Sequence, residues 1–328
     1  MKLATFKAAA SQRIGIVDAE RERVFDLAAA AGRAGVAAED FASMLALIDA
    51  DDAGLDRARH LIDARGGEDD LWHAFADLSL AAPLPEPRQM RDGMSYETHI
   101  RQSGRGARAI LARSTGGDAA FAAIMATPTD PLPDIYRQVP IYYITNRNTV
   151  VGPEATVVWP RYSQLMDYEL EVAVITKRQK ANIKADAARA HIFGYTIFND
   201  FSARDRQMIE MQGRLGPAKG KSFDHSNAMG PWIVTPDEIP DIQSLAVGVR
   251  VNGEVRATAS TAGMLFSFEE IIADAAQDET IRAGEVFGSG TVGNCCGLET
   301  GRLLQHGDTV ELDVERIGVL RNRVVRQD

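Results

Sequence analysis

Polar and apolar positions alternate most clearly over residues 166–175, which read Met-Asp-Tyr-Glu-Leu-Glu-Val-Ala-Val-Ile. Alternation with a period of two is typical of a β-strand, in which successive side chains lie on opposite faces. Glu169 and Glu171 are therefore expected to share one face of this strand. The opposite face would carry apolar side chains suited to a core: Tyr168, Leu170, Val172 and Val174.

Two adjacent carboxylates on an apolar strand have two physical explanations. Like charges repel, so a buried pair needs compensation, and a divalent cation that prefers oxygen ligands would provide it. An edge strand with a solvated acidic face would need no cation, because antiparallel sheets commonly expose one polar face to water. The strand by itself leaves both explanations open.

Residues 1–85 are expected to form a small N-terminal α/β domain. Short strands are predicted over 3–6 and 14–17, followed by alanine-rich helical sequence over 24–80. Two sets of apolar residues carry the helical spacing: Phe41, Leu45 and Ile48, then Leu71, Phe75 and Leu78. Three prolines within 81–87 predict a linker, because proline cannot continue a helix. We place the domain boundary between residues 85 and 86.

From residue 86 the pattern changes to short runs of β-branched and aromatic residues, which favour strands. Such runs cover 139–144, 156–159, 168–175, 195–198, 226–235, 247–251, 254–257, 310–314 and 319–325. Helices are expected over 185–192, over 202–211 from a capping-box-like start at Ser202, and after Ser267. Residues 86–328 therefore predict an α+β domain that is mainly β, without an alternating βαβ array.

Composition restricts the partners and the compartment. The 328 residues include 46 acidic and 36 basic side chains, for a formal net charge of −10. This charge disfavours nucleic acid and anionic membrane surfaces as partners, and no apolar run reaches the roughly twenty residues of a membrane span. The adjacent Cys295 and Cys296 would form a strained ring if oxidised, and no signal peptide is expected. We predict a cytoplasmic protein.

Four separated motifs, in the same order along the chain, resemble the fumarylacetoacetate hydrolase family over residues 91–325. They are Asp167-Tyr168-Glu169-Leu170-Glu171, the run from Gly194 to Asp205, Gly220-Lys221-Ser222-Phe223 and Gly288-Ser289-Gly290-Thr291. The resemblance implies that the catalytic domain is a mixed β-sandwich roll. It also implies a homodimer.

The resemblance further implies a metal-dependent active site. A divalent cation, with Mg²⁺ preferred and Ca²⁺ or Mn²⁺ as alternatives, would be held by four carboxylates: Asp92, Glu169, Glu171 and Asp200. His99 follows Asp92 by seven positions and matches the catalytic base. Glu299 matches the carboxylate that orients this histidine.

Other residues match the family's substrate contacts. Lys221, Arg204 and Gln207 match the groups that polarise and stabilise the substrate. Thr291 and one of Tyr142 or Tyr143, with Tyr143 preferred, match residues that touch it. Met94 stands where larger homologues carry a tyrosine that touches substrate, so this residue is expected to affect substrate choice.

Three functions remain open at this point. The first is a hydrolase that cleaves a carbon–carbon bond in a β-diketone-type acid, such as an acylpyruvate or fumarylacetoacetate, with His99 activating water. The second is a 2-oxo acid decarboxylase, hydratase, dehydratase or isomerase of the same fold. For either enzyme the partner would be a small anionic dicarbonyl or 2-oxo acid. The third is a metal-stabilised module without catalysis.

Overall fold

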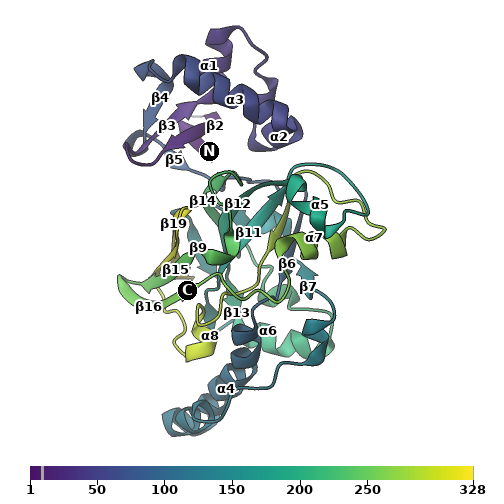
Figure 1. Ribbon diagram of the computed structural model, residues 1–328. Helices are drawn as coiled ribbons and strands as arrows, with labels where there is room; N and C mark the ends of the chain where they lie inside the picture. Colours follow the sequence, from purple (N-terminus) through teal and green to yellow (C-terminus); the bar gives the residue numbers. More distant parts are fainter. Residues whose placement is uncertain (9–10, 328) are drawn as a thin grey trace.

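The computed structural model describes residues 1–8 and 11–327, and most of its strands belong to two large sheets (Figure 1). The main path of the twelve-stranded sheet runs β4-β3-β2-β1-β14-β12-β11-β17-β6-β7, with β5 beside β1 and β8 beside β14. The five-stranded sheet runs β16-β15-β18-β19-β9, and β10 pairs with β13. The expected α+β, mainly β fold is confirmed.

The elements have the following bounds. The strands are β1 (Lys2–Ala8), β2 (Ser11–Asp18), β3 (Arg23–Asp26), β4 (Trp72–Ala74), β5 (Ser79–Leu80), β6 (Gln89–Gly93), β7 (Tyr142–Ile144), β8 (Val150–Val151), β9 (Thr156–Trp159), β10 (Met166–Asp167), β11 (Leu170–Thr176), β12 (Ile192–Asp200), β13 (Ser202–Ala203), β14 (Asn227–Val234), β15 (Ala246–Val251), β16 (Glu254–Ser260), β17 (Glu285–Gly288), β18 (Thr309–Val314) and β19 (Gly318–Arg326). The α-helices are α1 (Leu27–Ala34), α2 (Met44–Asp49), α3 (Asp51–Arg65), α4 (Glu97–Met125), α5 (Ala185–Ala188), α6 (Arg204–Glu210), α7 (Phe268–Ala275) and α8 (Gly297–Thr300).

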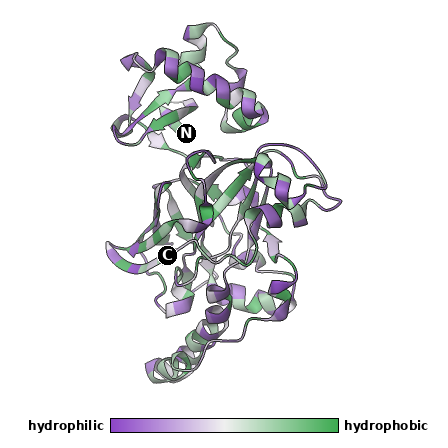
Figure 2. Ribbon diagram, in the orientation of Figure 1, coloured by the Kyte–Doolittle hydropathy of each residue, from purple (hydrophilic) through white to green (hydrophobic). Residues whose placement is uncertain are grey.

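Buried apolar residues of both sheets belong to one cluster, which includes Val172 of β11 and Val249 of β15. Figure 2 shows hydrophobic colouring on strands in the middle of the molecule. β11 pairs with β12 on one side and with β17 on the other, so it is an interior strand of the sheet. All of its residues are buried. As the alternation predicts, Leu170 and Val172 belong to one apolar cluster and Ala173 to another. The explanation of an edge strand with a solvated acidic face is therefore wrong.

The N-terminal region extends the larger sheet. β1 pairs antiparallel with β14, with Leu3 opposite Ile233. Leu27 and Leu47 of the N-terminal helices also share a hydrophobic cluster with Phe193 of β12. The predicted division into domains at residues 85 and 86 thus crosses a continuous sheet, and the domain boundary stays a prediction.

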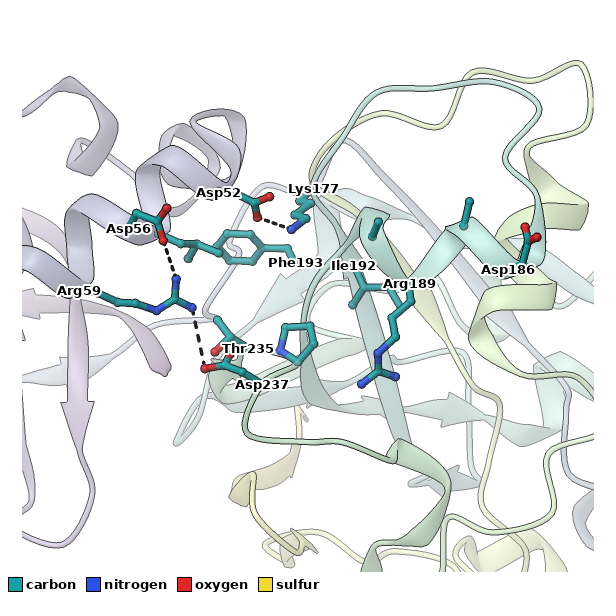
Figure 3. A pocket seen from close by; sticks show the side chains of 14 residues that line it. Asp52, Asp56, Arg59, Lys177, Asp186, Arg189, Ile192, Phe193, Thr235 and Asp237 are labelled. Carbon is teal, nitrogen blue, oxygen red and sulfur yellow. Dashed lines mark hydrogen bonds and ion pairs between the residues drawn. The ribbon is translucent and has the colours of Figure 1, made fainter.

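Ion pairs also join α3 to the rest of the chain, beside a groove of about 680 Å³ (Figure 3). Arg59 donates to Asp56 at 2.9 Å and lies 3.8 Å from Asp237, and Lys177 pairs with Asp52. Because the carboxylate of each pair is more than half exposed to solvent, each pair contributes at most about 1 kcal/mol to stability. Most of the attachment therefore comes from the shared sheet and the apolar cluster.

The structure adds one long helix that the sequence pattern did not predict. α4 lies at the opposite end of the molecule from α1 to α3 (Figure 1). Its apolar stripe is interrupted by several glycines, and glycine lowers helix propensity by about 1 kcal/mol. At Gly117 the backbone leaves the helical region, with φ of 68°, so the element contains a kink.

Two other local predictions are wrong. Residues 71–78 are not an α-helix, because Trp72–Ala74 pairs with β3 as a strand. Helix α6 begins at Arg204 without a side-chain cap, since the Ser202 hydroxyl donates to the Asp200 carbonyl at 3.0 Å. The capping box expected at Ser267 is present and starts α7.

Candidate active site

A cavity of about 710 Å³ lies between α4, α6 and the ends of strands β6 and β11. Ten of the twelve predicted site residues line it: Asp92, Met94, His99, Tyr143, Glu169, Glu171, Arg204, Gln207, Lys221 and Thr291. The other two contact members of this set, Asp200 through Tyr143 and Glu299 through His99. The structure therefore brings all twelve residues together, and their individual roles stay predictions.

Neighbouring strands place two carboxylates over one glycine, and a third carboxylate lies within 4.8 Å of them. β17 lies between β6 and β11, and its Gly288 is opposite Asp92 on one side. A Cβ atom at Gly288 would lie 2.4 Å from Asp92 Oδ1 and 2.8 Å from Glu171 Oε2. The glycine is needed here because any side chain would occupy the space of the carboxylates. Asp200 reaches the same place from the end of β12.

Asp92, Glu171 and Asp200 form a buried carboxylate cluster, which we call the acidic cluster. Each offers an oxygen, and these oxygens all lie within 4.8 Å of one another. In the described part of the chain, Asp92 Oδ1, Glu171 Oε1 and Asp200 Oδ1 have no hydrogen-bond partner. Buried anionic oxygens without donors are costly unless a cation neutralises them.

The pKa shifts in the acidic cluster follow from the same burial. Burial, and then the neighbouring Asp92 carboxylate, raises the pKa of Glu171 well above its usual value. Burial also raises the pKa of Asp200, and the nearby Lys221 ammonium only partly opposes this effect. The donor set fits a hard divalent cation, because Mg²⁺, Ca²⁺ and Mn²⁺ prefer carboxylate oxygens.

Glu169 lies beside the acidic cluster, but cationic side chains hold its oxygens. Oε1 accepts a hydrogen bond from Arg204 Nη2 at 2.8 Å, and Oε2 pairs with Lys221. Lys221 also pairs with Asp200, so this lysine bridges two of the predicted metal ligands. Burial alone would raise the pKa of Glu169, but Arg204 and Lys221 outweigh it and lower that pKa. Glu169 is therefore an anion at neutral pH.

His99 and Glu299 form a pair at the junction of two helices. His99 Nδ1 lies 3.2 Å from Glu299 Oε1, and Nε2 lies 4.0 Å from Glu169 Oε1. Glu299 is fixed in turn, because its Oε2 accepts the Cys296 N–H at 3.1 Å. The helices approach closely at Gly106, where a Cβ atom would lie 2.0 Å from the Leu298 carbonyl oxygen. Within residues 1–8 and 11–327, Glu299 Oε1 makes no hydrogen bond, so the pair is defined by its 3.2 Å separation. With Nδ1 beside this carboxylate, Nε2 is the ring nitrogen that can act as a base.

Asp167 is a site residue to which the sequence analysis gave no role. Its carboxylate accepts the backbone N–H groups of Gly297 and Leu298 at 2.7 and 2.8 Å, and Arg204 Nε at 2.8 Å. It therefore ties the first turn of α8, which carries Glu299, to Arg204. Its position next to the two-glutamate strand is a weak signal, but these partners are far away in sequence.

Three other predicted residues, Tyr143, Gln207 and Met94, each make a hydrogen bond within the site. The Tyr143 hydroxyl donates to Asp200 Oδ2 at 2.7 Å, and burial raises the pKa of Tyr143. Gln207 Oε1 accepts from Arg204 Nη1 at 2.9 Å, which leaves the amide NH₂ as its available donor group. The Met94 sulfur accepts from the Tyr136 hydroxyl at 3.3 Å.

Residues 90–325 match the family model described as the C-terminal domain of fumarylacetoacetate (FAA) hydrolase. The chain belongs to the fumarylacetoacetate hydrolase family. The resemblance drawn from the four motifs is thereby confirmed, and the family's known folds agree with the sheets described above.

Relatives within this family carry several enzyme names. A bovine protein named oxaloacetate tautomerase FAHD2A, mitochondrial, is 37% identical over 189 residues, which are 57% of this chain and 59% of that protein. Fumarylacetoacetate hydrolase from Exiguobacterium antarcticum is 26% identical, with a TM-score of 0.70 and full coverage of both chains. Maleylpyruvate hydrolase from Sphingobium sp. SYK-6, in complex with manganese(II) and pyruvate, is 20% identical with a TM-score of 0.71, also over both full chains. Matched structures also include a 5-carboxymethyl-2-hydroxymuconate delta-isomerase.

The comparisons place this chain among enzymes without selecting one reaction. The match spans 59% of the bovine relative, and the names among the relatives include a tautomerase, hydrolases and an isomerase. Over residues 1–8 and 11–327, no helix has the length and apolar character needed to cross a bilayer. The cytoplasmic location and the homodimer stay predictions.

Proposed function

We propose that this family member is a metal-dependent hydrolase that cleaves a carbon–carbon bond in an acylpyruvate or related β-diketone acid. The observation that carries the proposal is the His99–Glu299 pair at the wall of a cavity that also holds the acidic cluster. A base with a free Nε2, next to a site for a cation, is the arrangement that water activation requires.

The cation would be Mg²⁺, with Ca²⁺ or Mn²⁺ as alternatives. Asp92, Glu171 and Asp200 would hold it through their unpartnered oxygens, with Glu169 as a fourth ligand once its contact with Lys221 is relaxed. When bound, such an ion supplies Lewis-acid polarisation of carbonyl oxygens and balances the negative charge of the site. The structure of a family neighbour with manganese(II) and pyruvate supports this assignment.

His99 would begin the reaction by taking a proton from water through Nε2, while Glu299 stabilises the resulting imidazolium. The hydroxide forms a bond to the acyl carbonyl carbon, and Lys221 and the Gln207 amide stabilise the developing oxyanion. The carbon–carbon bond then breaks, and its electron pair stays on the pyruvate fragment. That carbon takes a proton from His99, so the products are a carboxylic acid and pyruvate. Arg204, Tyr143 and Thr291 would orient the substrate.

A His99→Gln variant tests the proposal with acetylpyruvate as substrate. Glutamine fills similar space but cannot act as the base, so we expect kcat to fall by about 10²–10⁴. The wild-type enzyme should release acetate and pyruvate in equal amounts, lose activity with a chelator and recover it with Mg²⁺ or Mn²⁺. An unchanged kcat in the variant would remove His99 from the mechanism.

A second candidate is tautomerisation of a 2-oxo acid such as oxaloacetate, which is favoured by the name of the bovine relative. This reaction moves a proton between carbon and oxygen and consumes no water, so the same histidine would suffice. The ultraviolet absorbance of enol-oxaloacetate would report it directly. Fast loss of that absorbance, together with no cleavage of acetylpyruvate, would select the tautomerase.

A further inference from the structure

The cavity extends far beyond the acidic cluster along helix α4. His99, Ser103, Ala107 and Leu111 all line it. Their spacing of four residues places them along one side of the helix. At 1.5 Å per residue, the line from His99 to Leu111 is about 18 Å long. Along it, the side chains change from a base to small and then apolar groups.

The facing wall shows the same change. Gln207, Met208, Met211 and Leu215 also line the cavity, and their exposure rises from the half-buried Gln207 and Met208 to the exposed Met211 and Leu215. At the opening, Leu111 is 62%, Met211 52% and Leu215 99% exposed. Single exposed apolar residues are common, but three around one cavity mouth form a surface that a ligand can cover.

Positive charge near the opening is scarce. Arg108 lines the cavity, but Asp130 holds both of its terminal nitrogens, at 2.7 and 2.9 Å. Arg214 is exposed at the rim and makes no ion pair within residues 1–8 and 11–327. A carboxylate on the distal end of a substrate would thus find Arg108 already paired, and Arg214 as the exposed arginine beside several apolar side chains. An exposed ion pair contributes little binding energy.

We propose that the acyl group of the substrate is an uncharged alkyl or aryl group that lies between Leu111 and Met211. This inference rests on the proposed hydrolase function, which places the dicarbonyl unit at the acidic cluster. A cavity of about 710 Å³ lies in the range of about 300–1,000 Å³ that is typical of small-molecule sites. The acetyl group of acetylpyruvate would fill only the charged end, whereas a longer apolar group would displace water along both walls.

Three acylpyruvates test the proposal: acetylpyruvate, 4-methylpentanoylpyruvate and succinylpyruvate. The last two have similar shapes, but succinylpyruvate ends in a carboxylate. Each buried methylene group contributes about fourfold to transition-state binding. We expect kcat/KM for the 4-methylpentanoyl compound to exceed that of each of the other two at least tenfold. Equal or higher kcat/KM for succinylpyruvate would overturn the proposal.

Matched variants test the location of the apolar group. Leu111→Asp adds a charge to an exposed helix position and should lower the ratio of kcat/KM for 4-methylpentanoylpyruvate over acetylpyruvate at least fivefold. Val255→Asp is the control, since Val255 is 61% exposed on β16 and does not line the cavity. An unchanged ratio in Leu111→Asp would contradict the proposed position.

A binding measurement separates failure of this proposal from failure of the hydrolase function. If no acylpyruvate is cleaved, the hydrolase function is wrong. The apolar subsite is then tested by calorimetry with Mn²⁺ and two 2-oxo acid analogues, oxamate and N-isopentyloxamate. At least tenfold tighter binding of N-isopentyloxamate supports the subsite, and equal affinities overturn it.

Discussion

Replacing Glu171 with glutamine should have opposite effects on stability in the absence and presence of a divalent cation. The substitution keeps the side-chain volume and an oxygen that can accept the Gly290 N–H, which Glu171 Oε2 accepts at 3.0 Å. It removes one charge from the acidic cluster. Two unit charges 4.8 Å apart repel by about 3 kcal/mol at an effective dielectric constant of about 20.

Without metal, we expect Glu171→Gln to be more stable than the wild type by about 1–3 kcal/mol at pH 8. The gain is smaller than the full repulsion, because Lys221 and partial protonation already relieve part of it. The raised pKa values of Glu171 and Asp200 give the sign of the pH effect. The stabilisation associated with these two carboxyl groups is fully present below the ordinary carboxyl pKa, and it is lost as pH rises through their raised pKa values. The metal-free wild type should therefore weaken from pH 5 to 8, and the variant should weaken less.

With metal, the order should reverse. A ligand at a thousand times its Kd stabilises the folded state by about 4.1 kcal/mol, which exceeds the metal-free advantage of the variant, and the variant would bind the ion more weakly. Urea titrations of the wild type and of Glu171→Gln, each in a chelator and in excess Mn²⁺, measure the four free energies of unfolding to be compared. Each set is recorded at pH 5.5 and at pH 8. The exposed Glu20→Gln variant is the control for the substitution itself. A metal-free variant that is less stable than the wild type at pH 8, with an unchanged gain from Mn²⁺, would refute this reasoning.

Three other predictions follow from single contacts. Asp167→Asn weakens the link between Arg204 and α8, so we expect the free energy of unfolding to fall by about 3–5 kcal/mol in urea titrations. A variant as stable as the wild type would contradict the importance of this buried pair. Burial raises the pKa of the Cys295 and Cys296 thiols, so iodoacetamide should leave both unmodified at pH 8 until the protein unfolds, as mass spectrometry would show. Gly106→Ala should lower kcat, and it should lower stability by about 1–3 kcal/mol, because its Cβ would strike the Leu298 carbonyl. The control Gly32→Ala has open space around its Cβ and should be neutral or stabilising.

Much of the site could be predicted because its chemistry is local in the sequence. The alternation around Glu169 and Glu171 predicts a strand with both carboxylates on one side, and both line the cavity. Whether this strand is buried could not be decided from the local sequence pattern. It depends on β12 and β17 flanking β11, and β17 (Glu285–Gly288) is far from β11 (Leu170–Thr176) in the chain.

The apolar half of the cavity was missed because its helix was missed. Glycines weaken the helical pattern of α4, which is held in place by packing against α8. Without α4 there is no reason to place Ala107 or Leu111 beside His99. Asp167 was missed for a related reason, since its partners on α8 follow it by about 130 residues. Contacts between distant segments are set by tertiary packing, which the local pattern does not contain.

The central claim is that the acidic cluster holds a divalent cation within reach of His99. Anomalous diffraction at the manganese edge, from crystals grown with Mn²⁺ and oxalate, tests it most directly. We predict one strong anomalous peak, from a manganese ion coordinated by Asp92, Glu171 and Asp200, with oxalate on the side of His99. An acidic cluster without a peak, in crystals that hold Mn²⁺ elsewhere, would contradict the claim.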